Sequence, residues 1–244
     1  MRYDTSKFPE GVQSYLRYSK VVDQYRYKKL PAKIENDSVY NTTNQSCIRW
    51  EDWDWSEIKE LKYLFDEPYV VLTHLNLPEL ISLDYLFDGT KPQGDVVSFT
   101  FKKIQSLRRM GFKANQIKFI DCDWSNLTYI GDFGLNQVAK FDAIDDCSKV
   151  TSVGQTFWGA HDTIVDFGGF INLKANWNSL GSPKDCPNLS VESLLNILNG
   201  LFDFVSADIT PSSSQGKIAL GTTNLAKLTD EQKAIATNKG WTLT

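Results

Sequence analysis

The sequence predicts an α/β fold. In it, a short and irregular solenoid of mixed strands and helices follows a non-repeat N-terminal segment and ends in a helix and strand. Three observations support this prediction. Apolar residues recur about every 23 positions in the middle of the chain, residues 1–65 lack that recurrence, and residues 228–244 combine a capped helix with a short strand. We therefore divide the chain into an attachment or capping segment (1–65), a repeat region (66–189) and a last repeat with its cap (190–244).

The repeat region contains four stretches that align on their apolar positions. They begin at Leu77, Trp124, Cys147 and Phe170, continue at Leu80, Leu127, Val150 and Leu173, and then at Leu83, Ile130 and Val153, where Asn176 breaks the pattern. The stretches are 47, 23 and 23 residues apart, so the first interval covers two periods. Leucine-rich repeats have periods of about 20–29 residues. We therefore expect a leucine-rich-repeat solenoid whose inward residues pack only against neighbouring repeats.

The 47-residue interval leaves room for one more repeat, and the residues between 89 and 117 are predicted to form it in an irregular way. Val97, Phe99 and Phe101 alternate with polar residues, as in a strand. Residues 104–110 are predicted as a helix that ends at Gly111, and the stretch ANQIKFIDCD supplies the next strand.

Residues 1–65 are polar and rich in Tyr, Asn and Lys, and Ser56 followed by residues 57–65 predicts an amphipathic helix. The candidate binding residues of this segment are Trp50, Trp53, Trp55, Tyr40 and Tyr63. Exposed rings of this kind dock to proteins or stack on carbohydrate. A further interpretation is that they are core residues of a cap that seals the first repeat.

The C-terminal part begins with a predicted helix. Ser190 suits its N-cap, and the apolar residues that follow are Leu194, Leu195, Ile197, Leu198 and Leu201. The stretch GKIALGTTNLAKL (216–228) predicts a strand and a turn.

The end of the chain predicts a terminal cap. Thr229 and Gln232 have the spacing of a capping box, and Gly240 suits the left-handed position that ends a helix. Residues 241–243 then predict a strand, which is stable at that length only in an existing sheet. We therefore expect this helix and strand to close the solenoid.

Composition argues against several classes of partner. The 244 residues include 26 Lys and Arg against 30 Asp and Glu, so recognition of nucleic acid through its phosphates is not expected. No apolar run reaches transmembrane length, and residues 1–20 lack the apolar core of a signal peptide. We expect neither a membrane partner nor a signal peptide.

Residues that carry chemistry are few and scattered. The cysteines, at positions 47, 122, 147 and 186, form no CxxC pair and are expected to be small buried residues of a cytosolic chain. His74 and His161 lie in no nucleophile or metal motif. Asp123 and Asp146 stand 23 residues apart, which favours turn formers over calcium ligands. We expect no catalytic, cofactor or metal site.

The stretch VTSVGQTFWGA (150–160) resembles the BspA-like leucine-rich repeat, in which a Val-Thr-x-Ile-Gly core precedes Phe and a small residue. LTYIGDFG (127–134) is a weaker copy. The chain from DFGGFINLKANW (166–177) onward is similar to the ending of many leucine-rich-repeat proteins of gut Bacteroidales and of their crAss-like or related phages. The resemblance covers roughly residues 117–244.

This resemblance implies a non-enzymatic protein whose repeats bind other molecules. With no signal peptide predicted, we expect a structural, receptor-facing component of a bacteriophage particle (tail, fibre or capsid-associated). It would be made in the host cytoplasm and be a homo-oligomer or multi-copy virion protein. Its N-terminal segment would contact other virion proteins, and its repeats a host-surface glycan or protein. The alternative is a Bacteroides surface protein that binds glycan or protein, and a polysaccharide-degrading glycoside hydrolase is a lesser alternative.

Overall fold

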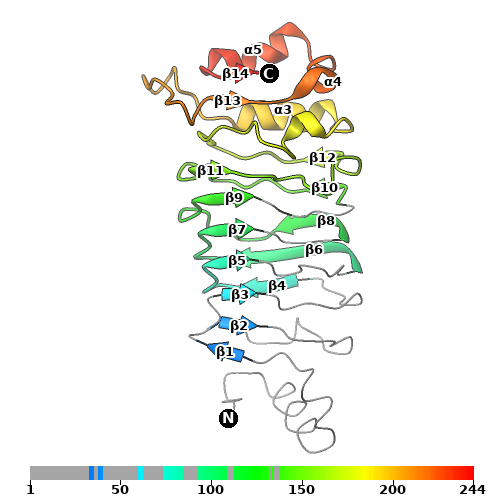
Figure 1. The fold of residues 1–244 in the computed structure, drawn as a ribbon, viewed down its shortest axis with the longest axis vertical. Coiled ribbons are helices and arrows are strands. Elements are labelled where there is room, and N and C mark those ends of the chain that lie inside the picture. The colour runs from blue at the N-terminus through cyan, green and yellow to red at the C-terminus, as the bar shows by residue number, and fades with distance from the viewer. Residues whose placement is uncertain are drawn as a thin grey trace, which may run out of the picture.

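The computed structural model describes residues 33–35, 38–40, 60–62, 74–84, 93–108, 113–131, 133 and 138–244. Most of the described strands belong to two sheets that run side by side along the molecule (Figure 1). From the third strand onward, consecutive strands join the two sheets in turn, so each circuit of the chain adds one strand to each sheet. We call one such circuit a rung. The described part is therefore α/β, with parallel strands and few helices.

The strands of the seven-stranded sheet are, in order, β1 (Lys33–Glu35), β2 (Ser38–Tyr40), β3 (Glu60–Lys62), β5 (Ser82–Asp84), β7 (Ser106–Arg108), β9 (Tyr129–Gly131) and β11 (Ser152–Val153). Those of the five-stranded sheet are β12 (Asp166–Phe167), β10 (Lys140–Phe141), β8 (Lys113–Phe119), β6 (Gln93–Phe101) and β4 (His74–Leu77). Neighbouring strands are parallel except β1 and β2.

A column of apolar side chains fills the core behind the seven-stranded sheet. Its members, each the register partner of the next and all buried, are Leu83, Leu107, Ile130 and Val153. A second buried set is Leu80, Leu127, Val150 and Leu173. Ile130 pairs with Val153 at the predicted interval of 23 residues, and the Thr151 N–H donates to the Thr128 carbonyl at the same interval. The predicted period is confirmed at these rungs.

Aromatic rings fill the core behind the five-stranded sheet. Ring contacts lead from Phe119 through Phe141 and Phe167 to Trp177, with centroid distances of 5.3, 5.8 and 5.8 Å. Tilted and edge-to-face pairs at these distances add to the stabilisation from burial alone. Of these four residues, Phe141, Phe167 and Trp177 are each no more than 2% exposed. At these positions the aromatic content of the chain serves the core.

The helix predicted over residues 104–110 is wrong, because Ser106–Arg108 form strand β7. Ile104 and Leu107 are both fully buried, so the apolar spacing that suggested a helix is satisfied by a turn followed by a strand. Leu107 pairs with Leu83 on one side and with Ile130 on the other. Pairing with both neighbouring rungs outweighs local helix propensity.

The helix predicted over residues 57–65 is also wrong where the structure describes it. Glu60–Lys62 form strand β3, which pairs in parallel with β2 and β5. Strands β1, β2 and β3 of the N-terminal segment therefore extend the seven-stranded sheet beyond the rungs that were recognised as repeats.

The predicted helix after Ser190 is confirmed as α3 (Val191–Gly200), and Ser190 Oγ accepts a hydrogen bond from the Ser193 N–H. The helix packs against β12, at the end of the five-stranded sheet. Its apolar face consists of Leu194, Ile197 and Leu198, which are buried as predicted. The remaining C-terminal elements are a 3-10 helix, η2 (Pro183–Asp185), strand β13 (Lys217–Ile218), helix α4 (Gly221–Leu225), helix α5 (Asp230–Asn238) and strand β14 (Thr242–Leu243).

The stretch 216–228 contains the predicted strand, β13, but a short helix, α4, follows it where a turn was expected. Helix α5 then begins as predicted, because Thr229 and Gln232 form a complete capping box. None of the helices in the described ranges has the apolar length that crossing a bilayer requires.

The chain ends in the predicted cap (Figure 1). Gly240 has φ 86°, and the Trp241 N–H donates to the Ala236 carbonyl at 3.0 Å, which is the Schellman pattern of a helix end. β14 then pairs in parallel with β13. Trp241 is 3% exposed and its indole N–H donates to the Phe202 carbonyl at 2.8 Å. The helix and strand thus pack onto the preceding rung.

Candidate binding surfaces

The predicted aromatic binding site lies almost wholly outside the described residues. This applies to Trp50, Trp53, Trp55 and Tyr63. Tyr40 is in β2, where its backbone pairs with Lys33 of β1 and Lys62 of β3. The docking, stacking and capping interpretations of this set therefore stay predictions.

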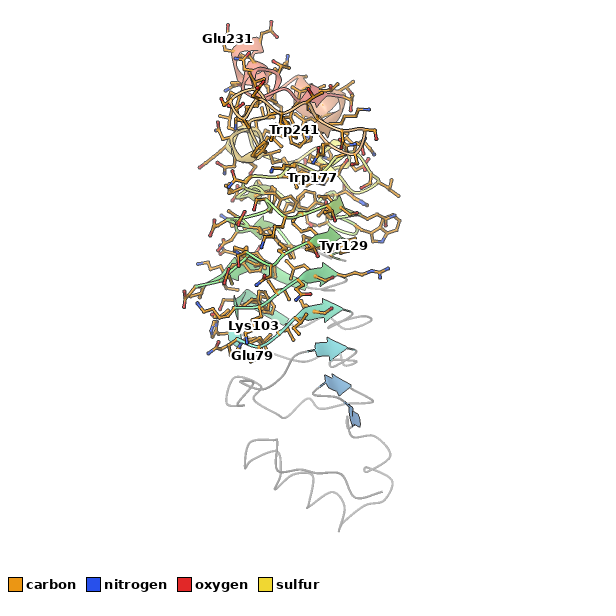
Figure 2. All side chains as sticks on the ribbon, turned by 90° about the vertical axis from the view of Figure 1, so that its left-hand side faces the viewer. Glu79, Lys103, Tyr129, Trp177, Glu231 and Trp241 are labelled. Atoms are coloured by element: carbon orange, nitrogen blue, oxygen red, sulfur yellow. The ribbon has the colours of Figure 1, made fainter. Side chains whose placement is uncertain are left out.

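The outward face of the seven-stranded sheet presents small and polar residues. Because the side chains of Leu107, Ile130 and Val153 point inward, those on either side of them point outward. The outward positions include Ser82, Ser106, Arg108, Tyr129, Gly131 and Ser152. A Cβ atom on Gly131 would lie 2.7 Å from the Tyr129 hydroxyl and 3.0 Å from the Gly154 backbone, so a larger residue would require the phenol ring and the neighbouring rung to shift. Figure 2 shows this sheet toward the viewer, with Tyr129 on it.

The outward face of the five-stranded sheet carries paired polar groups. Lys140 Nζ lies 2.9 Å from a carboxylate oxygen of Asp166, its register partner in the next strand. His74 Nδ1 lies 2.8 Å from Ser98 Oγ, and these two residues are also register partners. Both contacts are what direct cross-strand neighbours make in a parallel sheet. Strand register alone therefore accounts for the His–Ser contact.

The most exposed aromatic surface in the described ranges lies in the turns that lead from β11 to β12. Trp158 is 47% exposed there, and Leu180, on the adjoining turn of the next rung, is 51% exposed. The two turns are joined by a hydrogen bond from the Phe157 N–H to the Gly181 carbonyl at 2.9 Å. We call Trp158, His161 and Leu180 the Trp158 surface.

Polar groups lie within the Trp158 surface and at its border. The imidazole of His161 meets the indole edge-on, with the ring centroids 6.2 Å apart. Asp185 accepts hydrogen bonds from the Gly181 N–H at 2.7 Å and from Lys184 Nζ at 2.8 Å. Burial raises the pKa of Asp185, but the bonds from Lys184 and Gly181 outweigh it and hold the pKa below its usual value. The border thus includes an ionised carboxylate.

The cysteines that the structure describes lie in or near the core. Cys147 and Cys186 are buried, as predicted, and Cys122 is half-buried, while Cys47 is outside the described ranges. Burial raises the pKa of Cys122 to about 11 and of Cys186 to about 12, so both stay thiols at neutral pH. Within the part of the chain that the structure describes, no three His, Cys, Asp or Glu side chains are grouped as metal ligands.

The acidic positions predicted to form turns do so. Asp123 accepts a hydrogen bond from the Ser125 N–H, and Asp146 accepts one from the Ser148 N–H, each at 2.9 Å. Equivalent positions 23 residues apart therefore close the same kind of turn.

Sequence reasoning missed Trp158, although it lies within the stretch on which the family resemblance depends. Phe157 and Trp158 are adjacent, and Phe157 is fully buried against Phe167 and Trp177. The signal that could have found it is the pair of adjacent aromatic residues, of which one is buried in the core of the rung and the other is exposed. Comparison of the chain with protein-family models, curated proteins and solved structures gave no match.

Proposed function

We propose that this protein is a non-enzymatic binding and structural component of a bacteriophage particle, in the tail, in a fibre or on the capsid. Residues 1–65 contact other virion proteins, and the rungs form a short, irregular solenoid of BspA-like leucine-rich repeats that faces the host receptor. The repeats themselves carry no chemistry and offer a rigid surface.

One observation supports this proposal more than any other. The strand register from Ile130 to Val153 and the aspartate turns at Asp123 and Asp146 recur at the same 23-residue interval. A repeat that fixes both strand and turn is typical of solenoids, which bind through extended outer surfaces. The outward residues Ser82, Ser106 and Ser152 agree with such a surface, because small polar side chains leave it open to a partner.

The test is to look for the chain in purified particles. Phage particles are banded from a lysate of the culture whose phage encodes the chain, washed at high salt, and quantified by mass spectrometry against the major capsid protein. The chain should remain with the particles in a fixed copy number. Recovery in the bacterial surface fraction instead would contradict the proposal and favour the surface-protein alternative.

A further inference from the structure

We propose that the Trp158 surface is a carbohydrate-binding subsite, in which the exposed indole stacks on one face of a hexopyranose ring. This inference rests on the proposed receptor-facing role and names the chemical class of the receptor.

The exposure of Trp158 is imposed by its rung. Phe157 occupies the core, with ring centroids 5.2 Å from Phe167 and 5.7 Å from Trp177. The backbone at Trp158 is held by its N–H bond to the Gln155 carbonyl at 3.3 Å and by the Phe157–Gly181 bond. Gly159 follows with φ 85°, a conformation that favours glycine. The turn therefore keeps the indole outside, although burying a large apolar side chain is worth about 1.5–3 kcal/mol.

The groups around the indole fit a sugar. A pyranose ring has C–H groups on its faces and hydroxyl groups around its rim, so it needs an aromatic plane bordered by donors and acceptors. Trp158 supplies the plane and His161, edge-on to it, can both donate and accept. Asp185 adds a carboxylate on the adjoining turn, where it accepts a hydrogen bond from the Gly181 N–H.

A protein anchor would have other surroundings. Binding hot spots lie in well-packed, desolvated pockets within an interface of about 800 Å² per partner. In the turn that follows the indole, Gly159 and Asp162 are exposed, His161 is half-buried and Ala160 is buried. Leu180 is the exposed apolar neighbour, on the adjoining turn. A half-exposed ring among polar groups can accept a small ring without that large apolar rim.

The experiment is saturation-transfer NMR on the full chain, with the methyl glycosides of glucose, galactose, mannose and N-acetylglucosamine as probes. At least one glycoside should show transfer, strongest on the C–H protons of one ring face. Trp158→Ala should reduce the transfer about tenfold, the loss expected for about 1.4 kcal/mol of stacking. Trp158→Phe should retain part of it. Val205→Ala is the matched control, because Val205 is a 63% exposed apolar residue on another loop.

Transfer to none of the four glycosides, or undiminished transfer from Trp158→Ala to a glycoside, would overturn the subsite. So would loss of particle binding, rather than sugar binding, in Trp158→Ala, since the surface would then be a protein contact. The presence of the parent chain in particles is measured separately, so failure of the sugar subsite is distinguished from failure of the proposed function. Free sugar appearing in the same spectra would instead contradict the non-enzymatic function.

Discussion

Ser193 on α3 occupies the hydrogen-bonding position beside Phe167 that a further strand would take. The Ser193 hydroxyl oxygen accepts from the Phe167 N–H at 2.8 Å, and the hydroxyl donates to the Val165 carbonyl at 3.0 Å. Asn196, one turn further along the helix, donates to the Phe167 carbonyl at 3.2 Å. The five-stranded sheet thus ends against a helix whose side chains replace the next strand, which protects its edge from pairing with another chain.

Ser193→Ala should lower the free energy of unfolding by about 1–3 kcal/mol, because it leaves the buried Phe167 N–H without a partner. Urea unfolding measures this. Ser152→Ala is the matched control, since Ser152 is an exposed serine in β11, and it should leave the midpoint nearly unchanged. Equal stability of the two variants would show that the Ser193 hydroxyl does not close the sheet.

Val150→Asp should destabilise the rungs by several kcal/mol, on the order of 3–5, because it buries a charge without a partner. Val150 is 3% exposed, with Leu127 and Leu173 fully buried at the equivalent positions. Ser152→Asp adds the same charge two residues away on the outward face and should have little effect. Thermal unfolding followed by circular dichroism compares the two variants. Similar melting temperatures would contradict the inward position of Val150.

The parts of the fold predicted correctly are those encoded by adjacent residues. Thr229 with Gln232 specifies the start of α5, and Gly240 specifies its end, because capping bonds form within one turn of helix. The 23-residue period was predicted for a different reason, since a solenoid repeats its inward apolar residues at a fixed interval that can be counted in the sequence.

The errors arose where distant residues decide. Strands β3 and β7 are set by partners 22–24 residues away, such as Leu83 for Leu107, and local spacing resembled a helix in both places. Trp158 was missed for the same reason. Which of Phe157 and Trp158 faces inward depends on Phe167 and Trp177 in the core, and neither ring differs enough in apolar character to reveal it.

Trp241→Ala should destabilise the C-terminal cap by about 3–5 kcal/mol, through the cavity it leaves and the loss of the indole bond to Phe202. Thr242→Ala, at an exposed position in β14, is the control. Deleting residues 228–244 should go further and cause aggregation, since it exposes β13 and the apolar end of the last rung. Light scattering and urea unfolding check both, and a soluble, cooperatively unfolding truncation would contradict the capping role.

Asp185 should make stability depend on acid pH. Its pKa in the folded protein lies below the unfolded value of about 3.9, so the unfolded chain takes up the proton first as the pH falls. The stabilisation is therefore fully present above the unfolded pKa and is lost as the pH falls through the folded one. Asp185→Asn should be less stable than the parent at neutral pH, and urea midpoints of the two should converge toward pH 2–3. A constant difference would exclude the charge as the cause.

Attachment through the N-terminal segment is best tested in the full chain. Deleting residues 1–65 would remove β3, the partner of β5, and so damage the sheet whatever the segment binds. Trp53→Ala combined with Trp55→Ala avoids this. If the segment docks to the particle, the double variant should lose incorporation, because aromatic anchors carry most of the energy of such contacts. Its melting temperature should stay close to that of the parent.

The matched control is Trp158→Ala, which removes an aromatic ring from the rungs and should leave incorporation unchanged. Immunoblots of banded particles measure incorporation, and circular dichroism of the purified proteins measures melting. If the double variant unfolds at a much lower temperature, these tryptophans belong to a core, and the capping interpretation of the segment replaces docking. If it melts normally and still incorporates, the particle contact lies on the rungs instead.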